Sequence, residues 1–139
     1  MAANLNLVQF ELKLKIEQLL LQCAAGGFEM RANTGLRDPF EHAKLWRQSR
    51  SVEKIRAKIK EFETAGADFL KHCIEPVGPQ HGDPVTGAPP GYSWHQWGEA
   101  VDCFWLLDGK AQWSTTKKVG GLNEYKVYAD EVEKLGLVA

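Results

Sequence analysis

A histidine and an aspartate seven residues apart are the side chains of this sequence whose types best suit metal chemistry. His95 and Asp102 lie in a segment that runs Gly-Tyr-Ser-Trp-His-Gln-Trp-Gly-Glu-Ala-Val-Asp. A neutral imidazole and a carboxylate are suitable ligands for Zn²⁺, and a catalytic zinc site needs three protein ligands so that water can fill a fourth position. Residues at this spacing also share one face of a helix, so the two could form an ordinary surface pair. The composition of the segment argues against a helix and therefore favours the metal-binding interpretation.

The aspartate is expected to lie on a β-strand whose two faces differ. Around Asp102 the sequence favours β-structure, and Val101, Cys103 and Trp105 alternate with Ala100, Asp102 and Phe104. Asp108-Gly109 then predicts a hairpin turn before a short strand at 111–113. On such a strand, Cys103 points away from any metal that Asp102 binds and should pack in the core. Gly98 permits a tight turn between the histidine segment and this strand.

The order of residues from Ser93 to Asp102, Ser-x-His-x-x-Gly-x-Ala-x-Asp, resembles a known zinc-site signature. It is similar to that of the D-alanyl-D-alanine carboxypeptidase and L-alanoyl-D-glutamate endopeptidase superfamily, which includes VanY-like carboxypeptidases and several phage endolysins. The resemblance implies a Zn²⁺ cofactor with His95 and Asp102 as its first two ligands. It also implies that Ser93 hydrogen-bonds near the zinc site, because metal ligands need orienting partners.

A second part of the sequence resembles the same superfamily. Gly35-Leu36-Arg37 followed by a helix is similar to its upstream arginine motif, and Val85-Thr86 followed by Pro90-Gly91 is similar to the loop before Ser-x-His. In relatives this arginine helps to hold a carbonyl or carboxylate of the peptide, so Arg37 is expected to bind the substrate. A guanidinium suits the role because its planar fork can donate two parallel hydrogen bonds. The alternative is that Arg37 pairs with a neighbouring carboxylate.

The resemblance also places two catalytic groups beyond the end of the sequence. Relatives continue with Glu-x-x-His, whose glutamate is the general base and whose histidine is the third zinc ligand, so both are expected beyond Ala139. Without them, zinc-activated hydrolysis should be severely weakened. The ending indicates a shortened chain, a frameshifted relic or a lineage that kept the fold and lost catalysis, and the half-begun segment 137–139 favours shortening. Six residues remain open as substitutes for the missing groups: His42, His72, His81, Glu124, Glu131 and Glu133.

The function that the resemblance implies is that of a zinc metallopeptidase, a peptidoglycan hydrolase acting on stem peptides. It would cut either between L-Ala and D-Glu, in the manner of an endolysin, or between two D-Ala residues. The alternative is a non-catalytic module that keeps the fold and binds cell-wall peptide or metal. Charged residues interrupt the apolar stretch from Leu5 to Leu21, so neither a signal peptide nor a membrane span is expected. Synthesis in the cytoplasm, followed by action on the cell wall after release or injection by a phage or bacterium, is therefore expected.

The elements that must position these residues are predicted to form one domain. A chain of 139 residues with 44% hydrophobic and 25% charged content has the proportions of a single compact domain, here one that spans 1–139 and lacks the C-terminal segment of the family. An α+β fold is expected, in which helices pack on one side of a small, mostly antiparallel sheet and zinc lies at the open face of the sheet. Helices are predicted over 8–23, 38–48, 52–73 with a break near Gly66, and 122–135, and strands over 28–33, 100–105 and 111–113. The loop from Pro76 to Gly91, rich in proline and glycine, leads into the histidine segment.

Charge and cysteine content narrow the range of partners. The formal net charge is −1 and no basic segment or nucleic-acid-reading motif occurs, so nucleic acid is not expected to bind. Cys23, Cys73 and Cys103 are isolated from one another in sequence, without the close pairs typical of zinc ribbons or redox motifs. We expect them to be buried thiols, and we expect a peptidoglycan peptide to be the partner.

Overall fold

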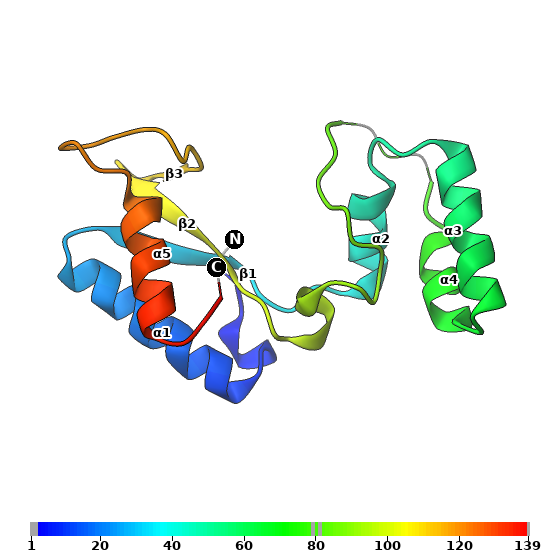
Figure 1. The fold of residues 1–139 in the computed structure, drawn as a ribbon, viewed down its shortest axis with the longest axis horizontal. Helices are drawn as coiled ribbons and strands as arrows, with labels where there is room; N and C mark the ends of the chain where they lie inside the picture. The colour runs from blue at the N-terminus through cyan, green and yellow to red at the C-terminus, as the bar shows by residue number, and fades with distance from the viewer. Residues whose placement is uncertain (1–2, 79, 81, 139) are drawn as a thin grey trace. The chain divides into compact units, whose positions relative to one another are not determined.

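The chain folds into two compact units, each with its own hydrophobic core. The computed structural model describes residues 3–78, 80 and 82–138. One unit comprises residues 1–36 and 98–139, and the other comprises residues 37–97. Over the described residues the chain has five α-helices and one three-stranded antiparallel sheet, which confirms the predicted α+β class (Figure 1).

The sheet lies in the first unit. Its strands are β1 (Glu29–Thr34), β2 (Asp102–Leu107) and β3 (Lys110–Gln112), in the order β1-β2-β3, and both pairings are antiparallel. The turn between β2 and β3 is at Asp108-Gly109, where both residues have positive φ (51° and 74°), as a two-residue hairpin turn requires. This confirms the predicted hairpin, although β3 begins and ends one residue earlier than expected.

Two helices cover one face of this sheet. A short 3₁₀ helix, η1 (Leu5–Leu7), precedes α1 (Phe10–Ala25), and α5 (Glu124–Lys134) packs beside α1 (Figure 1). Met30 and Trp105 are partners in the register of β1 and β2, and both are buried in one core. The residues that complete this core come from the two helices: Ile16, Leu19, Cys23 and Val132. Because side chains alternate along a strand, Asp102 and Phe104 lie on the opposite face.

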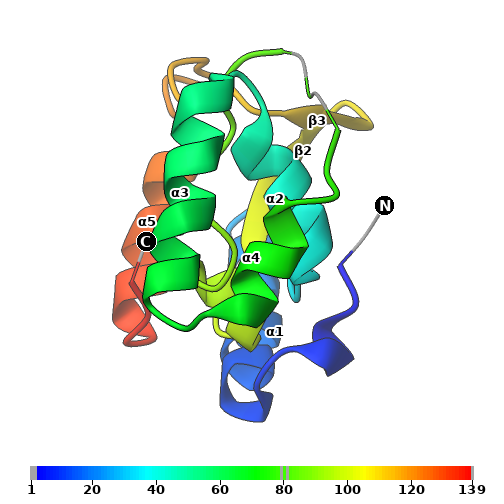
Figure 2. The ribbon, with the colours of Figure 1, turned by 90° about the vertical axis from the view of Figure 1, so that its right-hand side faces the viewer.

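The second unit is helical. It contains α2 (Pro39–Arg47), α3 (Val52–Thr64), α4 (Asp68–Ile74) and the 3₁₀ helix η2 (Trp94–Trp97), and α4 packs against both α2 and α3 (Figure 2). Its core is formed by Ala43, Trp46, Ile55, Phe62, Cys73, Ile74 and Val77. The predicted break in the long helix is confirmed, because Gly66 lies between α3 and α4 with a φ of 71°. Over the described part of the chain, no helix has the length and apolar content needed to cross a membrane.

Local signals set the start of α2. The Asp38 side chain accepts hydrogen bonds from the backbone N–H groups of Phe40 (2.7 Å) and Glu41 (3.4 Å), and Pro39 occupies the first helical position. Proline is tolerated there because its missing N–H would have no partner within the helix. Asp38 thus caps the helix that the sequence predicts from this residue.

The three cysteines are free thiols. Cys23 and Cys73 are buried, while Cys103 is partly buried against the core of the first unit. Burial raises the pKa of Cys23 to about 11, and the charge of Glu131 adds to the effect. Burial also raises the pKa of Cys73 and of Cys103. The thiol of Cys103 therefore lies on the core side of its strand, as predicted.

Replacement of Trp105 by alanine is expected to destabilise the first unit strongly. Trp105 is 2% exposed and packs between the sheet and both helices, so Trp105→Ala should lower the free energy of unfolding by about 3–5 kcal/mol. Urea denaturation followed by circular dichroism measures this. Trp113→Ala is the matched control, since Trp113 is 56% exposed, and its cost should be below about 1 kcal/mol. Equal losses in the two variants would contradict this assignment of the core.

Candidate metal and substrate site

His95 lies in a turn that is held by its own side chains. It is on η2 and is 8% exposed, whereas its neighbours Trp94 and Trp97 are largely exposed. Ser93 Oγ accepts a hydrogen bond from the backbone N–H of His95 at 3.3 Å. The side-chain oxygen of Gln96 accepts from the backbone N–H groups of Gly91 and Ser93, each at 3.3 Å. The imidazole is thus fixed to a short, internally hydrogen-bonded turn.

Arg37 is adjacent to this turn although it is far away in the sequence. Its backbone N–H donates to the carbonyl oxygen of His95 at 3.0 Å. Its side chain is half-buried, and Nη1 donates to Nδ1 of His42 at 3.2 Å. The structure therefore brings Arg37, Ser93 and His95 together within the second unit. The substrate-binding role of Arg37 and the orienting role of Ser93 stay predictions.

His42 is fully buried and both of its ring nitrogens have partners. Nδ1 receives the hydrogen bond from Arg37, and Nε2 lies 2.7 Å from the carbonyl oxygen of Ala88. Burial lowers the pKa of His42 from its usual 6.5. The hydrogen bond to Ala88 opposes this shift, while electrostatic interactions with Arg37 and His95 lower the pKa further. Because neither nitrogen is left for a metal, His42 is a poor substitute for the third zinc ligand.

The proline- and glycine-rich loop before His95 is held by the end of α2 and the residues that follow it. Arg47 donates to the carbonyl oxygens of Ile74 and Val77, and Gln48 donates to that of Asp83 at 2.8 Å. Side chains of the next two residues donate in the same way: Ser49 to Gly82, and Arg50 to Thr86 at 2.9 Å. Sequence analysis missed this set of donors. A run of polar residues at the end of a helix was its only signal.

Asp102 begins β2 in the first unit. It pairs with Thr34 of β1 at an irregularity in the register, and its side chain is exposed on the face opposite Cys103 and Trp105. The preceding Gly98 has a φ of 69°, and its carbonyl accepts a hydrogen bond from the backbone N–H of Gln9 at 2.8 Å. A Cβ at Gly98 would lie 3.2 Å from the Leu7 carbonyl oxygen, so a side chain would be strained there in two ways.

The two predicted metal ligands lie in different units. His95 belongs to the second unit and Asp102 to the first, and their convergence on one ion stays a prediction. The donor types fit zinc, but no group of three or more His, Cys, Asp or Glu side chains that could hold a metal occurs among the described residues. Of the other candidates, His72 lies on α4 and Glu124, Glu131 and Glu133 lie on α5, while His81 is outside the described residues. Among the described residues the predicted site therefore has two named donors, His95 and Asp102.

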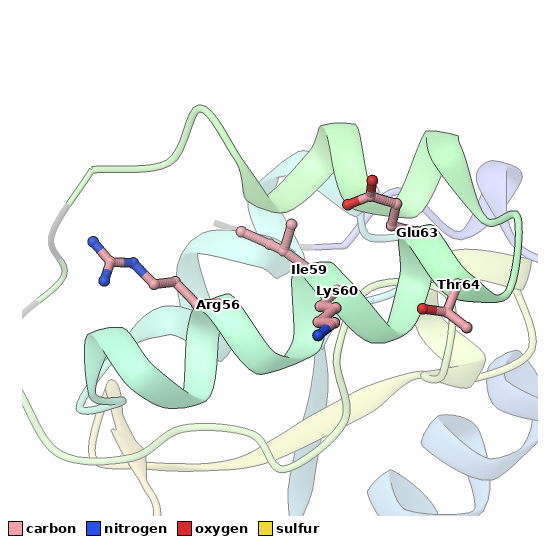
Figure 3. A pocket seen from close by; sticks show the side chains of 5 residues that line it. All are labelled: Arg56, Ile59, Lys60, Glu63 and Thr64. Atoms are coloured by element: carbon pink, nitrogen blue, oxygen red, sulfur yellow. The ribbon is translucent and has the colours of Figure 1, made fainter.

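A hollow on α3 is lined by residues other than those of the predicted site. It measures about 410 Å³ and is lined by Arg56, Ile59, Lys60, Glu63 and Thr64, all from one helix (Figure 3). None of these five residues belongs to the predicted site. We assign no chemistry to this hollow.

The motif Ser-x-His-x-x-Gly-x-Ala-x-Asp thus lies in an α+β chain in which the backbone of the arginine motif donates a hydrogen bond to the histidine turn. The family model for D-alanyl-D-alanine carboxypeptidase (VanY) matches residues 6–138. The chain belongs to this family, as the sequence motifs predicted. Membership implies peptidase activity and a peptidoglycan peptide as substrate. No curated protein gives a significant match.

The low pKa of His42 predicts a pH dependence of stability. Since folding favours the neutral imidazole, its contribution is complete above the unfolded value of 6.5 and is lost as pH falls from 6.5 through the folded pKa. The free energy of unfolding should therefore fall as the pH is lowered through 6.5. Urea denaturation at several pH values measures it. The free energy of unfolding of His42→Gln should fall less steeply over the same pH range, because the variant lacks His42 but keeps every other titrating group of the wild type. Parallel curves for the two proteins would contradict the prediction.

Proposed function

We propose that this chain is a zinc metallopeptidase that hydrolyses peptidoglycan stem peptides, either between L-Ala and D-Glu or between two D-Ala residues. Membership of the carboxypeptidase family supports the reaction class. The observation that carries the proposal is the hydrogen bond from the backbone of Arg37 to the carbonyl of His95, because it joins the substrate-binding motif to the metal-binding motif. In this proposal both units serve one peptidase domain, since the family match spans both.

Each residue has a distinct role in the proposal. His95 and Asp102 hold Zn²⁺ at the open face of the sheet, and the ion supplies a Lewis acid and an activated water when it is bound. Arg37 donates hydrogen bonds to a carbonyl or carboxylate of the peptide and so fixes its position. Ser93 keeps the His95 turn in shape through the backbone hydrogen bond between them. The exposed rings of Trp94 and Trp97 offer apolar walls beside the histidine.

The place of action is part of the proposal. A peptidase of this family must reach the cell wall, and we propose an endolysin-like route in which the chain is released or injected by a phage or a bacterium.

A non-catalytic module is the second candidate, and one observation favours it. Among the described residues no group of three metal-binding side chains occurs, and no side chain in them has been assigned as the general base. Such a module would bind stem peptide through Arg37 without cutting it.

Metal content and peptide digestion separate the two candidates. We expect the purified chain to bind one equivalent of zinc, as measured by inductively coupled plasma mass spectrometry. His95→Ala and Asp102→Asn should each weaken zinc binding by at least about 100-fold, because the loss of mere orienting partners already costs up to that much. Asp130→Asn, at an exposed position of α5, is the matched control and should bind zinc normally.

The same samples decide whether the chain cuts. Digestion of purified muropeptides should release either new amino termini or free D-alanine when zinc is supplied, as detected by mass spectrometry. Binding of stem peptide with no product would support the module instead. Unchanged zinc binding in both His95→Ala and Asp102→Asn would contradict the proposal that these two residues bind zinc.

A further inference from the structure

One buried histidine connects the predicted substrate-binding arginine to the loop that precedes the histidine turn. His42 lies on α2, receives a hydrogen bond from Arg37 Nη1 at 3.2 Å and contacts the carbonyl oxygen of Ala88 at 2.7 Å. It is 0% exposed, so water does not compete for either nitrogen. The motifs assign no role to this residue.

The partners of His42 determine where its proton lies. A guanidinium has only donors and a backbone carbonyl has only acceptors. Nδ1 must therefore accept from Arg37, and Nε2 must carry the proton that it donates to Ala88. An imidazolium could not accept the hydrogen bond from Arg37, so the ring has to be neutral. The lowered pKa of His42 agrees with this requirement.

The carbonyl at the far end of this chain of hydrogen bonds is itself held in place. The backbone N–H of Ala88 donates to Oγ1 of Thr86 at 3.3 Å, and the carbonyl of Thr86 accepts from Arg50 at 2.9 Å. Arg50 in turn lies over the ring of Trp46, 4.9 Å from its centroid. The loop segment 86–88 is thus fixed to α2, and it provides a firm support for His42.

From these contacts we propose that His42 is a positioning residue, which holds the Arg37 guanidinium in its peptide-binding orientation by bridging it to the carbonyl of Ala88. The inference rests on the proposed role of Arg37 as the substrate anchor. A long, rotamer-rich arginine side chain loses less freedom on binding a peptide when it is already oriented. The contact with His42 is made by one guanidinium nitrogen, Nη1.

The first experiment measures affinity, by isothermal titration of the chain with a synthetic stem pentapeptide ending in D-Ala-D-Ala. Arg37→Ala should abolish binding. His42→Leu, which keeps apolar volume but removes both hydrogen bonds, should weaken binding by about 10-fold. His42→Gln should restore affinity to within about 3-fold of the wild type, because an amide has one acceptor and one donor for the same two partners. Lys44→Ala, at an exposed position of the same helix, should bind as the wild type does.

The second experiment reads the hydrogen bonds directly and needs no peptide. ¹⁵N NMR of the imidazole in the wild-type chain at neutral pH should show a neutral ring with its proton on Nε2. A proton on Nδ1, or a charged ring, would overturn the inference even if the His42 variants failed to fold.

The possible failures can be told apart. Loss of binding in Arg37→Ala together with wild-type affinity in His42→Leu overturns the positioning role and leaves the proposed anchor intact. Unchanged binding in Arg37→Ala overturns the anchor and with it the inference. A wild-type chain that binds no pentapeptide overturns both, while the imidazole spectrum still reports whether the bridge exists.

Discussion

Among the described residues between 76 and 91, several backbone carbonyl groups accept hydrogen bonds from side chains, and the arrangement of the second unit depends on these contacts. Donors from α2 and the residues after it, Arg47 to Arg50, reach carbonyls along the loop, and His42 reaches Ala88. Buried backbone polar groups are costly when they are left unpaired. The pairing that satisfies the loop also fixes the segment that leads into the His95 turn, and it gives Arg37 a neutral imidazole as its neighbour.

Local signals in the sequence predicted much of this fold. The Asp38 cap, the break at Gly66 and the hairpin turn at Asp108-Gly109 all depend on a few adjacent residues, and all three are present. The boundaries of the first helix and the last one shifted by one to two residues, because periodicity shows which face is apolar better than it shows where a helix ends.

The site could be predicted only in part. Ser93, His95 and Asp102 form a contiguous motif, which a sequence reveals directly, whereas the partners of Arg37 come from distant segments. Nothing local indicates that the imidazole of His42 faces an arginine on one side and a carbonyl on the other. From the sequence, His42 was only a candidate substitute for the missing zinc ligand or base. Both of its ring nitrogens are hydrogen-bonded within the protein, which argues against metal binding. The family match adds the reaction class, while a third zinc ligand and a general base stay predictions from the motif resemblance.

The interior thiols have a consequence for a protein that works on the cell wall. Thiolates, not thiols, attack disulfides and react with oxidants, and the pKa of about 11 at Cys23 leaves almost none of it ionised at neutral pH. Burial also raises the pKa of Cys73 and that of Cys103. Burial and the raised pKa values thus keep the three thiols largely un-ionised, which slows their reaction with disulfides and oxidants.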